Sequence, residues 1–144
     1  MISGTEEKKI VLGIGSNSPD AEEKVRKAVG MLRGTFSRLQ VSSVYPTLPE
    51  GDARPGRNYF NAVAATETVM SLPELGCFLK AYESANGRTA ESKAAGLIPI
   101  DIDIVIYDGE ILRPADLSRN YFRKGYEELT GTRSESEMNA NPYA

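Results

Sequence analysis

The stretch Pro-Ile-Asp-Ile-Asp-Ile-Val-Ile, residues 99–106, decides the fold. It predicts a buried strand, because β-branched residues dominate it and nothing after its first residue breaks an extended chain. Side chains alternate between the two faces of a strand, so Asp101 and Asp103 share one face, about 7 Å apart. Val105 continues that acidic face. The opposite face is apolar and holds Ile100, Ile102, Ile104 and Ile106.

Two neighbouring carboxylates on a largely buried strand repel each other and lose hydration, which costs several kcal/mol. A hard divalent cation removes this problem, since Mg²⁺ takes one or two carboxylates and completes its shell with water and phosphate oxygens. The other interpretation is an edge strand with two solvated aspartates. The pattern by itself leaves both open.

The chain has 144 residues, of which 40% are apolar and 26% charged, a composition that suits one soluble globular domain. We assign that domain to residues 1–129 and expect a disordered polar tail over 130–144. The net charge of −3 argues against a general nucleic-acid or anionic-membrane surface, which would need a basic patch. It leaves a small anionic substrate open, and nothing in the sequence indicates the oligomeric state.

The sequence contains one cysteine, Cys77, and no histidine. A single cysteine allows no intrachain disulfide and fits a reduced cytoplasmic setting. In its predicted helix Cys77 is expected to be a small core residue. Mechanisms with a histidine base or ligand are excluded, and we expect neither a signal peptide nor a membrane span.

Hydrophobic periodicity predicts the order β-α-β-β-α-β. Strands are predicted over residues 9–15, 39–45, 58–69 and 99–106. The first helix is expected to begin at Ser18 as N-cap with Pro19 in its first position, and to stop at Gly34. The second begins at the capping box of Ser71 and Glu74 and ends at Asn86-Gly87.

This order is typical of an α+β, ferredoxin-like sandwich, an antiparallel sheet with both helices on one face and the first and third strands in the middle. Two long loops, 46–57 and 88–97, should enclose a site together with the exposed sheet face. A hairpin turn at Asp108-Gly109 leads into a short return strand within 110–113, and 115–129 is weakly helical.

The sequence resembles the 6-hydroxymethyl-7,8-dihydropterin pyrophosphokinase family of folate biosynthesis over about residues 8–126. No single segment is specific to that family, but five occur in the family's order. They are Gly15-Ser16-Asn17, residues 41–45 with Thr47, residues 58–63, Glu83 with Gly87-Arg88, and Ile100-Asp101-Ile102-Asp103-Ile104.

The resemblance implies the ferredoxin-like fold, a cytoplasmic ATP-dependent diphosphotransferase, and transfer of pyrophosphate from ATP to the pterin hydroxymethyl oxygen. It implies two Mg²⁺ ions on Asp101 and Asp103, with Arg88 as a catalytic and phosphate-binding arginine. The implied pterin-binding residues are Thr47, Tyr59, Asn61 and Tyr126. The implied nucleotide-binding residues are Glu83, Arg88, Ile104 and Tyr121.

Each of these residues also has an ordinary structural interpretation. Tyr59 and Asn61 can be sheet-face residues, and Tyr126 a satellite core aromatic. Arg88 can be a solvated cation that complements a helix dipole. Glu83 can pair with a lysine on its own helix, which would contribute little to stability.

The loop before the acidic strand departs from the family, which has an arginine-rich segment with a tryptophan there. Here the segment reads Ala94-Ala95-Gly96-Leu97-Ile98-Pro99, and the position two residues after Arg88 is Ala90. Such arginines neutralise the β- and γ-phosphates, and Lys93 could replace part of that charge.

Three hypotheses follow. The chain is a divergent pyrophosphokinase, a relative that binds pterin or nucleotide without the chemistry, or an unrelated module that lays single-stranded RNA on sheet aromatics. The acidic pair on the working face argues against the third. We favour the enzyme, because Asn61 and both aspartates are present together.

Overall fold

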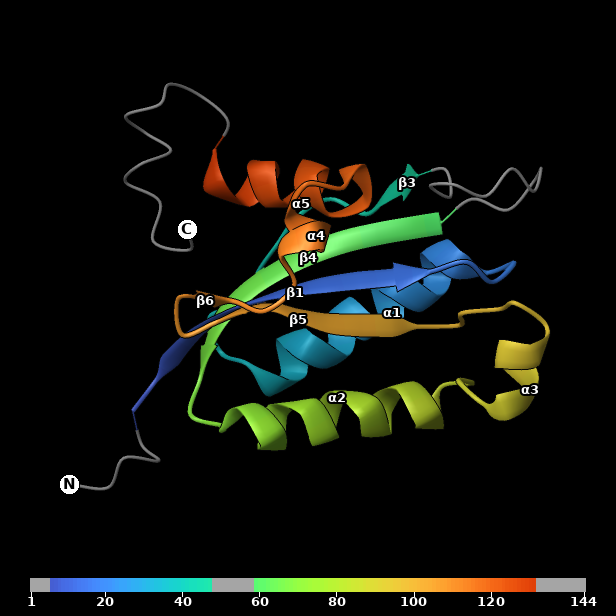
Figure 1. Cartoon of the computed structure of the whole chain (residues 1–144), viewed down its shortest axis with the longest axis horizontal. Coiled ribbons are helices and arrows are strands. Elements are labelled where there is room, and N and C mark those ends of the chain that lie inside the picture. The colour runs from blue at the N-terminus through green and yellow to red at the C-terminus, as the bar shows by residue number, and fades with distance from the viewer. Residues whose placement is uncertain (1–5, 48–58, 132–144) are drawn as a thin grey trace.

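The computed structural model describes residues 6–47 and 59–131, which form one six-stranded sheet with helices on both faces (Figure 1). The elements, in chain order, are β1 (Lys8–Ser16), α1 (Ala21–Thr35), β2 (Gln40–Val41), β3 (Tyr45–Thr47), β4 (Tyr59–Thr68), α2 (Leu72–Ala85), α3 (Ala90–Ala94), β5 (Asp101–Tyr107), β6 (Glu110–Ile111), α4 (Pro114–Leu117) and α5 (Asn120–Thr130).

The strand order is β2-β4-β1-β5-β6, with β3 also paired to β4 and every pairing antiparallel. The first strand, β1, and the third predicted strand, β4, therefore lie in the middle of the sheet. The α+β, ferredoxin-like arrangement and its two central strands are confirmed. Most of loop 46–57 and the tail after residue 131 lie outside the described residues.

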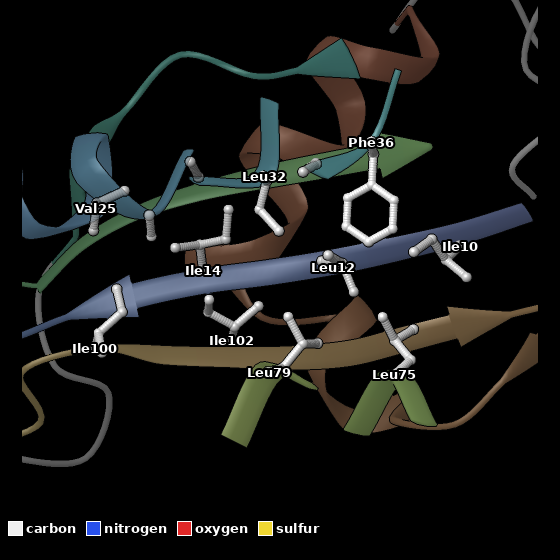
Figure 2. Close-up of a cluster of buried hydrophobic side chains, with 13 residues drawn as sticks. Ile10, Leu12, Ile14, Val25, Leu32, Phe36, Leu75, Leu79, Ile100 and Ile102 are labelled. Atoms are coloured by element: carbon white, nitrogen blue, oxygen red, sulfur yellow. The ribbon is translucent and has the colours of Figure 1, made fainter. Parts of the chain in front are cut away.

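The main core lies between the sheet and helices α1 and α2. Figure 2 shows Val25 and Leu32 of α1 and Leu75 and Leu79 of α2 directed at the isoleucines and leucine of β1 and β5. Helical spacing puts these residues on one face of each helix. Burying each large aliphatic side chain stabilises the fold by about 1.5–3 kcal/mol, so this layer holds the strands in place beneath the site.

A second, smaller core covers part of the other sheet face, which the sequence left exposed. Helices α4 and α5 pack on β5 and β4, and Phe122 of α5 is buried there with valines and Ile106. The expectation that this whole face is open is therefore wrong. Within the described residues, a cavity on this face lies at the start of β4 and β5.

The face predicted for Ile106 is also wrong. The register against β1 shifts between Val11, which pairs with Ile106, and Leu12, which pairs with Ile104. A bulge of this kind places two consecutive side chains on one face. Val105 and Ile106 consequently both join the second core, and only a pairing partner could have revealed the bulge.

The helix boundaries follow local chemistry with two exceptions. The capping box of Ser71 and Glu74 is formed at the start of α2, as predicted. Helix α1, however, begins at Ala21 with Asp20 as N-cap, and the Ser18 hydroxyl donates a 2.7 Å hydrogen bond to Asp20 Oδ1. The predicted start at Ser18 and Pro19 is therefore early, and α1 also continues one residue past Gly34.

Three further predictions need correction. The strand predicted over 39–45 is two short strands, β2 and β3, separated by residues 42–44. The Ser42 hydroxyl bridges this gap by accepting from the Val63 amide at 2.9 Å. The loop 88–97 contains the short helix α3. Cys77 is exposed on α2 rather than buried.

Among the described residues, no helix has the length and apolarity needed to span a membrane.

Candidate active site

The floor of the candidate site lies where three antiparallel strands run side by side. Gly15 of β1 pairs with Asn61 of β4 on one side and with Asp101 of β5 on the other. Two interstrand spacings separate Asn61 from Asp101, about 10 Å between their Cα atoms. A Cβ atom on Gly15 would lie only 2.8 Å from Asn61 Oδ1. The glycine therefore leaves the room that the asparagine side chain occupies.

A cavity of about 320 Å³ opens above this floor. Its walls come from the ends of β1, β3, β4 and β5, from Ile98, and from the segment 113–122. The lining residues are Gly13, Ile14, Gly15, Thr47, Tyr59, Asn61, Ile98, Asp101, Asp103, Arg113, Asp116, Arg119, Tyr121 and Phe122. It combines aromatic walls with an amide at one side and two carboxylates at the other, and we call it the amide cavity.

The amide of Asn61 is fixed within the amide cavity. Its Nδ2 donates to Thr47 Oγ1 at 2.6 Å, and the residue is 4% exposed. A buried amide oriented in this way can present both a donor and an acceptor to a flat heterocycle. Tyr59, two residues earlier on the same strand face, supplies an aromatic surface beside it.

Asn17 connects this cavity to the segment before β5. Its Oδ1 accepts from the Ile98 amide at 2.6 Å, and its backbone amide donates to the Ile98 carbonyl at 3.0 Å. Its Nδ2 reaches the Gly96 carbonyl at 3.2 Å and the Tyr59 hydroxyl at 3.4 Å. Asn17 therefore ties the end of the 88–97 loop to the aromatic wall of the amide cavity.

A second cavity, of about 370 Å³, lies between α2 and the outer edge of β5. We call it the helix cavity. It is lined by Gly76, Leu79, Lys80, Glu83, Arg88, Asp101, Ile102, Asp103, Ile104 and Arg113. The strand edge is open here because β6 pairs only with Ile106 and Tyr107. The backbone groups of β5 on this side therefore face the cavity.

Arg88 and Glu83 form a charged network with Asp101 at the helix cavity. Arg88 Nη1 donates to Asp101 Oδ1 at 2.6 Å and lies 3.4 Å from Glu83 Oε1. Glu83 Oε2 accepts from the Ile102 amide at 2.8 Å, which ties α2 to β5. Burial, with repulsion from Asp101, raises the pKa of Glu83 above its usual value.

Asp103 has the most perturbed carboxyl group of the site. Burial is the largest cause and the charge of Asp101 the next, and together they raise the pKa of Asp103 to about 7. The guanidinium of Arg113 opposes this effect but is 3.9 Å away. A strongly perturbed acid in a cavity is a frequent mark of a functional site.

Arg113 is held by a buried acid that the sequence analysis did not single out. Its Nε donates to Asp116 Oδ2 at 2.5 Å, and the Asp116 side chain is only 9% exposed. The Tyr121 hydroxyl donates to the other Asp116 oxygen at 2.6 Å. The hydrogen bonds run from Tyr121 through Asp116 to Arg113, which lines both cavities.

The structure brings most of the predicted site residues together. Thr47, Tyr59, Asn61 and Tyr121 line the amide cavity, Glu83, Arg88 and Ile104 line the helix cavity, and the two aspartates line both. Tyr121, predicted on the nucleotide side, is thus on the side of Asn61. Tyr126 is not among the cavity-lining residues and stacks on Phe122 at 5.4 Å between ring centroids. Lys93 of α3 lines neither cavity.

Sequence reasoning gave no site role to eight of the residues that line the amide cavity: Gly13, Ile14, Gly15, Ile98, Arg113, Asp116, Arg119 and Phe122. Gly13, like Gly15, lies in β1 on the floor of the site, where it pairs with Asp103. The segment that contains Arg113, Asp116, Arg119 and Phe122 has only weak hydrophobic periodicity. Across residues 6–47 and 59–131, no cluster of three or more His, Cys, Asp or Glu side chains that could hold a metal is found. Two carboxylates still fit Mg²⁺, which takes one or two and fills its shell with phosphate and water.

Comparison with known proteins shows the family to which the chain belongs. A family model described as 7,8-dihydro-6-hydroxymethylpterin-pyrophosphokinase matches residues 11–130, which is most of the chain and includes every predicted site residue. The chain belongs to the hydroxymethylpterin pyrophosphokinase family. The ferredoxin-like sheet is therefore that of this family.

Two curated relatives of the pyrophosphokinase family agree with this assignment. The 2-amino-4-hydroxy-6-hydroxymethyldihydropteridine pyrophosphokinase of Aquifex aeolicus is 33% identical over 104 residues, 72% of this chain and 64% of the relative. The folate synthesis bifunctional protein of Chlamydia trachomatis is 36% identical over 106 residues, 70% of this chain and 23% of the relative. The matched region thus spans less than two thirds of either relative.

Proposed function

We propose that this chain transfers the pyrophosphoryl group of ATP to the hydroxymethyl oxygen of 6-hydroxymethyl-7,8-dihydropterin, a step of folate biosynthesis, and releases AMP. The observation that carries the proposal is the meeting of the two cavities at one carboxylate pair, Asp101 and Asp103. A group that passes from a donor in one cavity to an acceptor in the other must cross this pair.

The amide cavity suits the pterin. Its volume of about 320 Å³ falls within the usual range for small-ligand sites. Asn61 offers a paired donor and acceptor to the ring edge, and Tyr59 offers an aromatic surface to one of its faces. Thr47, which accepts from Asn61 Nδ2, sets the orientation of that amide.

The helix cavity suits ATP. Open backbone groups of β5 near Ile104 can bind the base, and the cations Lys80 and Arg88 lie along the same cavity. Arg88 is already directed at Asp101, where the phosphates would lie. Glu83 holds the backbone of β5 in position at this cavity, because one of its oxygens accepts a hydrogen bond from the Ile102 amide.

Asp101 and Asp103 would hold the two Mg²⁺ ions. Their mutual repulsion and partial burial are what a divalent cation relieves. When bound, Mg²⁺ neutralises phosphate charge and orients the donor for in-line displacement. The residues of the chain position the two substrates and exclude water, which is most of the catalysis that transfer at phosphorus requires.

The test is an assay of AMP formation from ATP, Mg²⁺ and the reduced hydroxymethylpterin. We expect AMP from the wild-type chain and a loss of at least about a hundredfold in Asp101→Ala and Asp103→Ala. Asp108→Asn, at the exposed hairpin turn, removes a carboxylate away from the site and should keep full activity as the control. Equal activity in the wild type and both site variants would contradict the proposal.

A second candidate, binding without chemistry, is favoured by one observation, the lack of arginine in residues 89–99. It predicts no AMP, but calorimetric pterin binding that Asn61→Ala abolishes. The third hypothesis, an unrelated module that binds single-stranded RNA, is wrong, because the family model matches residues 11–130. We further propose that the protein works in the cytoplasm, which fits its single cysteine.

A further inference from the structure

We propose that Arg113 is the phosphate-binding arginine that holds the β- and γ-phosphoryl groups during transfer, in place of the arginines absent from residues 89–99. This inference rests on the proposed function and adds a residue to it. Arg113 precedes α4 and lies 3.9 Å from Asp103, whereas Arg88, at the start of the 88–97 loop, contacts Asp101.

Arg113 lies where the two cavities meet. The residues common to the linings of the two cavities are Asp101, Asp103 and Arg113. Among the described lining residues, the other cations are confined to one cavity each: Lys80 and Arg88 to the helix cavity and Arg119 to the amide cavity. Arg113 is therefore the described cation at the junction where the transferred group must pass.

The guanidinium of Arg113 is held along one edge by a buried acid. Asp116 Oδ2 accepts a hydrogen bond from Arg113 Nε at 2.5 Å. The other oxygen of Asp116 accepts from the Tyr121 hydroxyl at 2.6 Å. The terminal Nη2 lies 3.9 Å from Asp103 Oδ2, which is longer than a hydrogen bond. The planar fork is thus anchored at one edge, and its terminal nitrogens can take phosphate oxygens beside Asp103.

The reaction needs a cation at this position. The hydroxymethyl oxygen forms a bond to Pβ of ATP, the bond from Pβ to the α,β-bridging oxygen breaks, and AMP leaves with that oxygen. The hydroxyl proton goes to solvent. Negative charge is spread over the oxygens of the transferred group throughout, so a guanidinium fixed before the reaction stabilises it without reorganisation.

The test is calorimetric binding to the full chain with Mg²⁺, using α,β-methylene ATP and, separately, AMP. Arg113→Ala should weaken the triphosphate analogue by about ten- to a hundredfold, while AMP affinity changes less than about twofold. Arg113→Lys, which keeps the charge and loses the fork, should recover part of the difference. Arg123→Ala, an exposed arginine paired with Glu127 on α5, is the control and should bind both ligands as the wild type does.

Loss of affinity for both ligands in equal measure would overturn the inference, because it would mean that Arg113 only maintains the fold. No change for either ligand would overturn it as well. If Arg113→Ala does not fold, the same comparison is made with Arg113→Lys, which should lose more affinity for α,β-methylene ATP than for AMP. Binding that depends on Arg113 without any AMP formation would contradict the proposed function and leave Arg113 as a polyphosphate ligand.

Discussion

At the scale of single residues, the site is built from a carboxylate that is poorly accommodated without a cation. Burial and Asp101 raise the pKa of Asp103 to about 7, so the folded chain holds a proton there that the unfolded chain releases at lower pH. Sites that keep such a group sacrifice stability for function.

We predict that Asp103→Asn stabilises the metal-free protein at alkaline pH. The pKa of Asp103 is higher in the folded chain than in the unfolded chain. Its ionisation therefore costs no free energy of unfolding below about pH 4, and the cost grows as the pH rises until it is complete above about 7. The gain should be on the order of 1–2 kcal/mol at pH 8, after allowance for solvent screening, and close to zero at about pH 4.

Urea unfolding in EDTA at both pH values measures this difference. Asp108→Asn, at the exposed hairpin, controls for the loss of a carboxylate elsewhere on the surface. A gain that is equal at both pH values, or a loss of stability at pH 8, would contradict the account of Asp103.

Several site residues could be recognised from the sequence because they lie on regular strands. The two-residue repeat alone places Asp101 with Asp103 and Tyr59 with Asn61, and the structure lines cavities with all four. Arg113, Asp116 and Phe122 lie in a segment without a clear period. Their positions depend on how α4 and α5 pack on the sheet, and the neighbouring sequence does not determine this packing.

At the scale of elements, the segment from α3 to β5 depends on one asparagine. Asn17 holds Ile98 by two hydrogen bonds, at 2.6 and 3.0 Å, and reaches both Gly96 and Tyr59. These contacts fix the segment that enters β5 beside both cavities. We therefore expect Asn17 to position both substrate sites without binding either substrate.

The prediction is that Asn17→Ala raises KM for ATP and for the pterin together, and lowers stability by about 1–3 kcal/mol because buried backbone groups lose partners. Ser71→Ala is the control, since it removes the capping box of α2 at the other end of the sheet (Figure 1). It should cost about 1 kcal/mol and leave both KM values unchanged. Unchanged KM values in Asn17→Ala would leave Asn17 with a purely structural role.

Elements were predictable where one side-chain pattern decides them. The capping box fixes the start of α2, and Asp108 and Gly109 form the expected hairpin with φ of 53° and 84°. The bulge at Ile106 and the break between β2 and β3 depend on partners. Glu128 of α5, for example, takes the Ser43 amide and hydroxyl at 2.8 and 2.6 Å, far along the chain from that break.

At the scale of the whole molecule, the strand order brings the two proposed substrate sites together. Antiparallel pairing of β4, β1 and β5 aligns Asn61, Gly15 and Asp101 in one row. Helices α1 and α2 cover one face of the sheet and α4 and α5 pack on the other (Figure 1), and the two cavities are lined by residues at this end of the sheet. The element order predicted this topology, but the two cavities required packed side chains.

The most direct test of the account is ³¹P NMR of the complete reaction with ATP, Mg²⁺ and 6-hydroxymethyl-7,8-dihydropterin. We predict that AMP and a pterin diphosphate ester form in equal amounts, because both transferred phosphates cross the junction at Asp101, Asp103 and Arg113 as one unit. Formation of ADP with a pterin monophosphate, or no pterin-dependent change in the ATP resonances, would contradict the account.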